Sequence, residues 1–498
     1  MNKKVNIVGA GIAGLSAGCY LRANGYDTEI FELHSLPGGL CTAWQRGGYT
    51  FDGCIHWLVG SNPADPFYAL WNELIDMSAF TFVEPEEAMR VEDASGKYIS
   101  VFADIDRIEQ EMLSKAPGDA DLIRRYTAAA RKFTKFQFPL DKAPETQSLF
   151  DKACFFLKCL PYIKDMKYWM SITGGQLAAQ CQDPLLRATF RHMFVPDMAA
   201  LFLVWTQAWR HKKSAGYPVG GSLPFARKIE EKYLALGGRI NYNARVTKIL
   251  VENDTAKGIQ LENGETHPAD IVVSAADGRA TIYEMLQGRY VDSEIRRYYE
   301  HFKVFPSWLQ VSLGLSRMFE GTPHTIVFPL EKPIKIDDKH TRDHIGVRIF
   351  NFDPTMAPPG KTVVTAMFPT DNHTYWQNLR DTDKDAYNAE KQRIAREVIL
   401  ALDTRFGHIR AQVEQIDVST PATVIRCTNN WKGSLEGWVL TPDVGFLRMK
   451  KTLPGLRNFY MAGQWVEPGG GLPTAFLSGR NVTQLISKHD AKKFQKPG

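Results

Sequence analysis

The stretch that decides the fold is residues 5–40, VNIVGAGIAGLSAGCYLRANGYDTEIFELHSLPGGL. It begins with the short apolar run 5–8, which is typical of a buried strand. A helix is predicted over 12–24 and a second strand over 28–31, with Gly25 placed to end the helix. This order of strand, helix and strand predicts an α/β fold with a parallel sheet.

Three glycines join the first strand to the helix. Gly9, Gly11 and Gly14 form a G-x-G-x-x-G pattern, which in this context is of the Rossmann type. Gly9 permits the tight turn, Gly11 lets the backbone approach a pyrophosphate, and Gly14 lets the helix lie close to the sheet. The N–H groups at the start of the helix, at Ile12 and Ala13, would face the phosphates.

An acidic residue and a second glycine pair follow. Glu32 comes after Gly14 at close to the roughly 20 residues expected of an acid that binds ribose hydroxyls. We therefore predict dinucleotide binding, since a purely structural glycine turn would leave Glu32 unexplained. Gly38, Gly39 and Leu40 follow, and the glycine pair would let the chain fold back over the cofactor.

This segment resembles the two-glycine signature of FAD enzymes in the flavin amine oxidase and phytoene desaturase superfamily, and the resemblance implies FAD as cofactor. Many members carry arginine directly after the glycine pair, where this chain has Leu40. Residues 49–57, YTFDGCIHW, extend the resemblance to the F-D-x-G-x-H segment of the carotenoid desaturase/isomerase and retinol saturase branch. Phe51, Asp52 and His56 match, whereas Cys54 stands at the place of the glycine.

Two further segments resemble the same family in the same order. The first is 217–222, YPVGGS, followed by a predicted helix to 236 and strands over 239–242, 244–252, 258–261 and 271–275. The resemblance implies that Val246 holds the adenine through its backbone and that Ala276 lies beside the cofactor. A plain loop is the alternative for the glycines in 217–222.

The second is 458–475, NFYMAGQWVEPGGGLPTA, a strand that runs into Gly463 and a glycine-rich loop before a helix. The resemblance implies that Gly471, Leu472 and Thr474 face the flavin, where the helix dipole would stabilise negative charge. Glu467 lies in this loop.

The reaction needs a group that handles a proton. The resemblance makes His56 the first candidate, because its segment lies beside the flavin loop in related proteins, and Glu467 is the second. The alternative for each of these residues is a structural role.

Bulk composition limits the function classes. The 498-residue chain has 44% hydrophobic and 23% charged residues, as globular proteins do, and its net charge of +5 is too small to favour nucleic acid. The seven cysteines are scattered and form no C-x-x-C, and the histidines lack metal-ligand spacing, so we predict a reducing compartment and no metal site.

Lysines precede the first apolar run as in a signal peptide, but that run carries the nucleotide-binding glycines. No apolar stretch reaches the roughly 20 residues that span a bilayer, so we expect a cytoplasmic protein, or one bound peripherally to the inner face of a membrane.

The resemblance covers nearly the whole chain and implies a p-hydroxybenzoate-hydroxylase-like architecture. Residues 1–82, 215–285 and 432–490 would form a discontinuous Rossmann-like FAD-binding domain, and 83–214 and 286–431 an α+β substrate or cap domain. Candidate strands over 307–315, 325–328, 344–350 and 362–368 and a helix over 383–402, capped by Asp383, suit a mixed sheet above the flavin.

Residues 147–210 are the most apolar and aromatic part, with flanking lysines. They form either a cap facing the core or helices at a membrane surface.

These features predict an FAD-dependent oxidoreductase that acts on carbon–carbon bonds of a long apolar polyene, a carotenoid or retinoid. Saturation, desaturation and isomerisation all stay open, each involving hydride transfer with flavin N5. The sequence lacks a second Rossmann fingerprint, so NAD(P)H would be at most a transient electron donor, and the electron partner stays open. The alternatives are a flavin amine oxidase and a non-redox prenyl- or lipid-binding escort of the GDP-dissociation-inhibitor type. The intact glycines and Glu32 argue against the escort.

Overall fold

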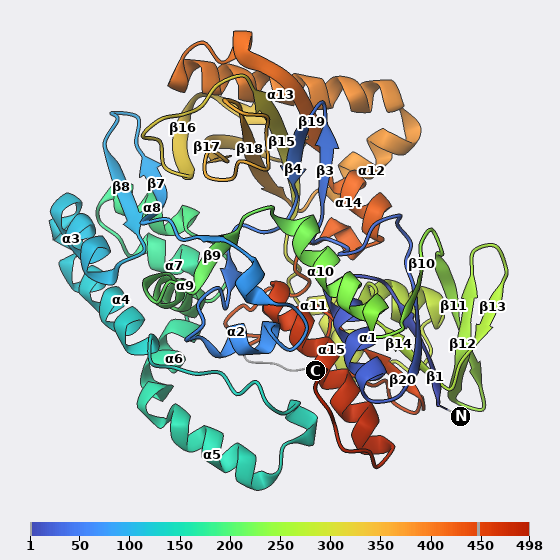
Figure 1. Cartoon of the computed structure of the whole chain (residues 1–498). Helices are drawn as coiled ribbons and strands as arrows, with labels where there is room; N and C mark the ends of the chain where they lie inside the picture. Colours follow the sequence, from blue (N-terminus) through green and yellow to red (C-terminus); the bar gives the residue numbers. More distant parts are fainter. Residues whose placement is uncertain (1, 446–448, 498) are drawn as a thin grey trace.

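The computed structural model describes residues 2–445 and 449–497 (Figure 1). A five-stranded parallel sheet in the order β10-β2-β1-β14-β20 unites segments that are far apart in the sequence. Its strands are β1 (Lys4–Val8), β2 (Asp27–Phe31), β10 (Arg239–Asn241), β14 (Ile271–Ser274) and β20 (Phe459–Met461). The predicted Rossmann-like α/β core is confirmed.

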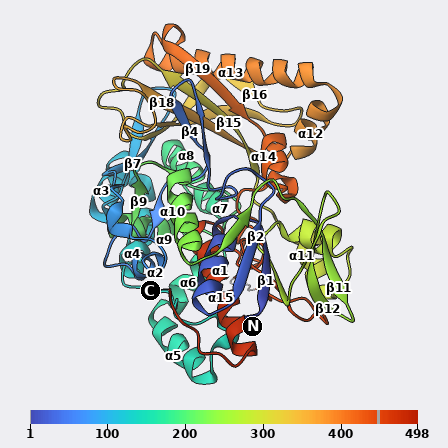
Figure 2. The same cartoon turned by 45° about the vertical axis from the view of Figure 1, so that its right-hand side comes forward.

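Helices cover one face of this sheet and a smaller sheet covers the other. Val5 and Ile7 point to α1 (Ile12–Ala23), α10 (Ser222–Ala235) and α15 (Leu472–His489), whereas Val8 joins a separate cluster on the opposite face. The opposite face carries the antiparallel β11 (Val246–Glu252), β12 (Thr255–Leu261) and β13 (Thr266–Pro268), with η5 (Ala280–Met285) and α11 (Ser293–His301) (Figure 2).

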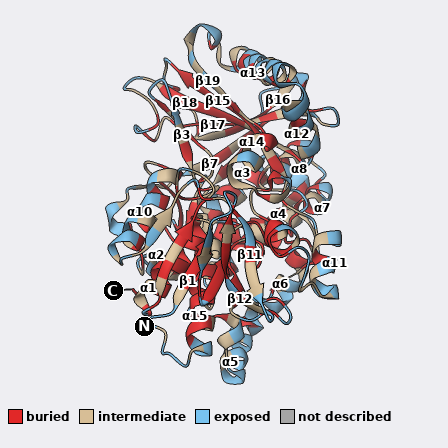
Figure 3. Ribbon diagram, turned by 90° about the vertical axis from the view of Figure 1, so that its right-hand side faces the viewer, coloured by how far each residue is buried: buried red, intermediate tan, exposed pale blue. Residues whose placement is uncertain are grey.

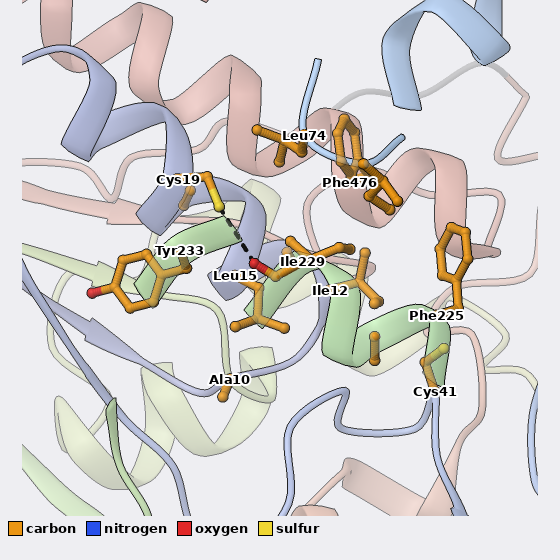
Figure 4. Packing of buried hydrophobic residues seen from close by; sticks show 14 of the residues in the cluster. Ala10, Ile12, Leu15, Cys19, Cys41, Leu74, Phe225, Ile229, Tyr233 and Phe476 are labelled. Carbon is orange, nitrogen blue, oxygen red and sulfur yellow. Dashed lines mark hydrogen bonds between the residues drawn. The ribbon is translucent and has the colours of Figure 1, made fainter. Parts of the chain in front are cut away.

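Helix α1 packs very closely against α10 and α15. The Cys19 thiol lies 3.7 Å from the Ile229 carbonyl oxygen in α10 (Figure 4). Ser16 donates to the Phe476 carbonyl in α15, and a Cβ at Gly479 would lie 2.4 Å from the Ala13 carbonyl oxygen. The helices therefore pack with their backbones nearly in contact.

A seven-stranded sheet in the order β19-β15-β18-β17-β16-β7-β8 forms a second layer, antiparallel except between β16 and β7. Its strands are β7 (Glu87–Glu92), β8 (Tyr98–Phe102), β15 (Ser307–Leu315), β16 (Thr325–Lys335), β17 (Thr341–Ile349), β18 (Thr362–Thr370) and β19 (Val413–Ser419). Helix α13 (Lys384–Phe406) crosses its outer face near α12 (His373–Thr382) and α14 (Pro421–Thr428) (Figure 1). The predicted cap is confirmed, because the Asp383 side chain accepts from the Ala386 N–H.

The two layers draw on different parts of the chain. All five parallel strands fall within the three segments predicted for the FAD-binding domain, and the seven mixed strands fall within those predicted for the substrate domain. The boundaries themselves stay a prediction. Short strands lie between the layers: β3 (Ala43–Arg46) pairs with β4 (Tyr49–Asp52), and β5 (Leu58–Val59), β9 (Ala215–Pro218) and β6 (Phe82–Val83) form a small sheet near α2 (Pro66–Trp71).

Helices α3 (Ile105–Lys115) and α4 (Ala120–Phe133) precede the apolar segment 147–210. That segment is divided among α5 (Leu149–Cys159), α6 (Ile163–Met170), α7 (Gly174–Ala179), α8 (Pro184–His192) and α9 (Leu201–His211). Helix α9 is buried in the core, as a cap would be, whereas α5 projects from the body (Figures 1 and 3). In residues 2–445 and 449–497, none of the helices combines the length and the apolar character needed to cross a membrane.

Candidate functional site

A cavity of about 2280 Å³ lies where the parallel sheet, the helices and the seven-stranded sheet meet. This exceeds the roughly 300–1,000 Å³ of a usual small-molecule site, so there is room for a dinucleotide and a second ligand. Apart from Gly14, every predicted site residue lines it: Gly9, Gly11, Ile12, Ala13, Glu32, Gly38, Gly39, Leu40, His56, Val246, Ala276, Gly463, Glu467, Gly471, Leu472 and Thr474.

The first glycine turn has the geometry that a pyrophosphate needs. Gly9 adopts φ +96° and donates to the Phe31 carbonyl, which fixes the turn at the end of β1. A Cβ at Gly14 would lie 2.0 Å from the Gly9 carbonyl oxygen, so Gly14 serves helix packing behind the cavity wall. A Cβ at Gly11 would meet its nearest atom, the Gly38 carbonyl oxygen, only at 4.0 Å, which leaves space for a ligand.

Glu32 is held at the cavity wall by the backbone. The side chain is 6% exposed, and its two oxygens accept from the Ala10 N–H at 2.6 Å and the His34 N–H at 2.8 Å. Burial raises the pKa of this carboxyl. The remaining lone pairs are available to ribose hydroxyls.

The second glycine pair folds back onto the first turn. The Gly38 N–H donates to the Ala10 carbonyl, and Gly38 and Gly39 adopt φ of +100° and +60°. A Cβ at Gly38 would lie 2.2 Å from the Cys41 carbonyl oxygen. The turn therefore requires glycine there, as predicted.

The segment around Asp52 contacts the segment around Gly221. Asp52 is buried and accepts from the Ser222 N–H and hydroxyl, both at 2.6 Å, and from the Cys54 N–H. A Cβ at Gly221 would lie 2.2 Å from an Asp52 oxygen. Gly221 is thus no plain loop residue, because it allows the carboxylate to cap the start of α10.

The C-terminal glycine loop presents a second helix start to the cavity. Gly469, Gly470 and Gly471 have φ of +115°, +70° and +81°, and Gly471 immediately precedes α15. No side chain in the described ranges caps the first turn of α1 or of α15. Two helix N-termini and an open glycine backbone on one cavity wall fit FAD, whose pyrophosphate and flavin edge both favour such donors.

His56 occupies the cavity wall but is poorly suited to give a proton. Its side chain is exposed to the cavity, while the surrounding protein shields it from bulk water. Burial and the nearby positive charge of Arg348 lower the pKa of His56 to about 3. Arg348 donates to the His56 carbonyl at 2.7 Å and the Ile55 carbonyl at 3.1 Å. A neutral imidazole at pH 7 is a weak acid, so this environment favours a positioning role.

Glu467 forms a buried ion pair. Its carboxylate lies 2.7 Å from Lys451 Nζ and accepts from the Asn481 amide at 3.1 Å, and the Lys451 side chain is fully buried. Lys451 also contacts Glu145 at 2.9 Å. These contacts favour the structural alternative for Glu467.

Sequence reasoning missed two charged residues of the cavity wall, Arg348 and Glu436, whereas the family resemblance implies that Asp277 ends its strand beside the cofactor, next to Ala276. Asp277 accepts from the N–H groups of Ala280 and Trp431, both at 2.8 Å, and burial raises its pKa to about 7. Arg348 comes from β17, and Glu436 follows the short helix η7 (Trp431–Gly433). No local pattern marks the latter two, because their position depends on how the two sheets meet.

Aromatic side chains line the part of the cavity beyond His56. Trp57 and Trp209 have ring centroids 6.2 Å apart, and Phe138 packs edge-on against Trp205 at 5.1 Å. The aromatic lining comprises Trp57, Phe67, Phe138, Phe194, Phe202, Trp205 and Trp209. This surface suits a long apolar ligand.

The fold and the glycine cradle define an FAD-binding flavoprotein. Residues 12–487 match the family described as flavin containing amine oxidoreductase, and the chain belongs to this family. The predictions of FAD as cofactor and of a flavin oxidoreductase are confirmed by this membership, which favours both enzyme hypotheses over the escort.

Curated relatives are similar over almost the whole chain. A 4,4'-diapophytoene desaturase from Methylomonas sp is 24% identical, covering 99% of this chain and 97% of that protein. Prolycopene isomerase 1 from an Oncidium hybrid cultivar is 24% identical, covering 95% of this chain and 82% of its own length. The expected resemblance to carotenoid desaturases and isomerases is thus confirmed.

Solved structures share the fold. An oxidoreductase from Methanosarcina mazei has a TM-score of 0.59 at 18% identity, covering 97% of this chain and all of that one. A redesigned putrescine oxidase has a TM-score of 0.62 at 13% identity, covering 98% and 99%. At these identities the likeness concerns the fold alone.

Proposed function

We propose that this protein is an FAD-dependent oxidoreductase acting on carbon–carbon bonds of a long apolar polyene of the carotenoid type. The observation that carries the proposal is a large cavity in which the glycine cradle continues into aromatic walls. The names of the curated relatives support the same substrate class. When bound, FAD supplies hydride transfer at N5, for saturation, desaturation or isomerisation.

The chain's own residues would orient the substrate and exclude water. Trp57, Phe138 and Trp209 would stack along the polyene, and burial of apolar surface would supply the affinity. Arg348 fixes the backbone at His56 and lies 4.9 Å from the Tyr217 ring. This arrangement would place His56 beside the reacting bond as a positioning group.

The test starts with the visible spectrum of the FAD-loaded protein. Under anaerobic conditions, oxidised protein is mixed with phytoene or 4,4'-diapophytoene, and dithionite-reduced protein with prolycopene or retinol, with products separated by chromatography. Bleaching or recovery of the flavin band with a changed polyene supports oxidation or reduction of the polyene, and an isomerised polyene with an unchanged flavin band supports isomerisation. A flavin band that responds to putrescine and to none of the polyenes would assign the protein to amine oxidation instead.

We also propose that α5 contacts a membrane surface from which the substrate enters. Leu149 is 85% exposed and Phe150 77% exposed, and Phe156 and Leu157 are exposed as well. Exposed lysines flank these side chains: Lys152, Lys158, Lys164 and Lys167. The loop before α5 lines the cavity through residues 138–140, which connects this surface with the substrate site. Apolar side chains ringed by lysines are typical of interfacial binding.

Vesicle flotation tests the membrane proposal. Wild-type protein should float with vesicles that contain anionic lipid, and the double variant Phe150→Asp, Leu157→Asp should stay in the dense fraction. The matched control is Leu400→Asp, an exposed leucine on α13 far from α5 in the fold (Figure 1). Equal flotation of wild type and the α5 variant would contradict the proposal.

A further inference from the structure

Glu436 lies on the cavity wall and touches the C-terminal glycine loop. A Cβ at Gly470 would be only 2.0 Å from Glu436 Oε2, so the carboxyl occupies the space beside that glycine. Gly470 stands directly before Gly471, the residue that immediately precedes α15. The carboxyl therefore sits against the loop that fits the flavin.

The backbone around Glu436 is fixed. The Gly437 carbonyl accepts from the Phe305 N–H at 2.8 Å. Trp438 is fully buried, and its indole N–H donates to the Trp465 carbonyl at 3.2 Å. These contacts tie the loop to the segment just before β15 and to the C-terminal glycine segment. The carboxyl is thus held in place by its backbone while its own oxygens stay uncommitted.

No hydrogen bond or ion pair joins the Glu436 carboxyl to any residue within 2–445 and 449–497. Glu32 and Glu467 differ, since backbone N–H groups hold the first and Lys451 the second. Burial raises the pKa of Glu436 to about 7. A carboxyl that titrates near neutral pH can both take and give a proton.

Four charged groups on neighbouring parts of the cavity wall have other partners. Asp277 accepts from two backbone N–H groups, and Lys303 pairs with Asp197. Lys432 lies over the Trp431 ring, and Glu467 pairs with Lys451. Within residues 2–445 and 449–497, Glu436 is therefore a half-buried acid without a counter-ion at the junction of the flavin loop and the cavity.

We propose that Glu436 is the residue that exchanges the reaction proton with the substrate, an inference that rests on the proposed function. In the desaturation direction, one C–H bond breaks and its hydrogen leaves with the electron pair as hydride, accepted by FAD. The neighbouring C–H bond breaks with its electrons forming the new C=C bond, and its proton passes to the Glu436 carboxylate. In saturation the protonated carboxyl returns that proton.

The test compares Glu436→Gln and Glu436→Asp with the exposed control Glu331→Gln. Flavin content and thermal unfolding first establish that each variant folds and binds FAD. The visible spectrum of each flavin-loaded protein is then titrated from acidic to alkaline pH without substrate. Wild type and E331Q should show a flavin band shift with a midpoint near 7, because a charge forms beside the flavin, and E436Q should lack it.

Turnover of phytoene, 4,4'-diapophytoene and prolycopene against pH gives the second readout. E436Q should be about 10²–10⁴-fold slower and lose the ionisation near pH 7, and E436D should retain part of the rate with a displaced profile. Wild-type rate and pH profile in E436Q would overturn the proposal, as would an unchanged flavin titration. If wild type converts none of these polyenes, the proposed function fails, and the titration alone decides whether Glu436 ionises beside the flavin.

Discussion

At the scale of single residues, the carboxyl groups around the cavity differ in their burial and in the hydrogen-bond donors that contact them. Glu32 and Asp277 accept from backbone N–H groups, and Glu467 is paired with Lys451. Glu436 is half-buried and has no such donor or cation among the described residues. These surroundings are the basis for proposing ribose binding for Glu32, a structural role for Glu467 and proton exchange for Glu436.

The Lys451 side chain should be critical for stability because it is fully buried between Glu145 and Glu467. Lys451→Met leaves two carboxylates without their cation, and the free energy of unfolding should fall by about 3–5 kcal/mol. Urea denaturation measures this. Lys228→Met, which removes an exposed pair with Glu231, should cost no more than about 1 kcal/mol. A loss in K451M as small as in K228M would show that the buried pair is dispensable.

At the scale of elements, two glycines of the first strand–turn–helix unit have different roles, one in helix packing and one in ligand binding. A Cβ at Gly14 collides with the Gly9 carbonyl oxygen, whereas a Cβ at Gly11 points into open cavity. Gly14→Ala should therefore destabilise the fold by about 1–3 kcal/mol. Gly11→Ala should fold normally and lose at least about tenfold in FAD affinity, equivalent to about 1.4 kcal/mol. Thermal unfolding of flavin-free protein and FAD titration separate the two effects, and tight FAD binding by G11A would contradict the assignment of the pyrophosphate site.

Local chemistry explains which elements the sequence could predict. Gly9, Gly38 and Gly471 adopt positive φ, so their positions already determine the turns. The helix capped by Asp383 was likewise predictable from its own residues. By contrast, α5 and α9 are both apolar with lysines nearby, and only tertiary packing buries one and exposes the other. The contact between Glu436 and Gly470 depends on two loops that are distant in the sequence, so no local pattern could indicate it.

At the scale of the whole molecule, the half-buried Glu436 makes the stability of the fold depend on pH. The pKa of Glu436 is raised to about 7 in the folded state from 4.5 as a free group, so the folded protein binds more protons between these values. The contribution to stability is fully present below about pH 4.5, falls as the pH rises toward 7, and is constant above 7.

Glu436→Gln removes this titration, so the difference in unfolding free energy between wild type and E436Q should change with pH. Wild type should lose up to about 1.4 kcal/mol per pH unit relative to E436Q between pH 5 and 7, and nothing further above 7. Urea denaturation of flavin-free protein at several pH values measures the unfolding free energy of each variant. Subtracting the value for E436Q from that for wild type removes the contributions of the other titrating groups. Glu331→Gln should give a curve parallel to wild type. If E436Q also runs parallel to wild type, Glu436 is ionised in the folded protein throughout, and it could not hold the proton that saturation requires.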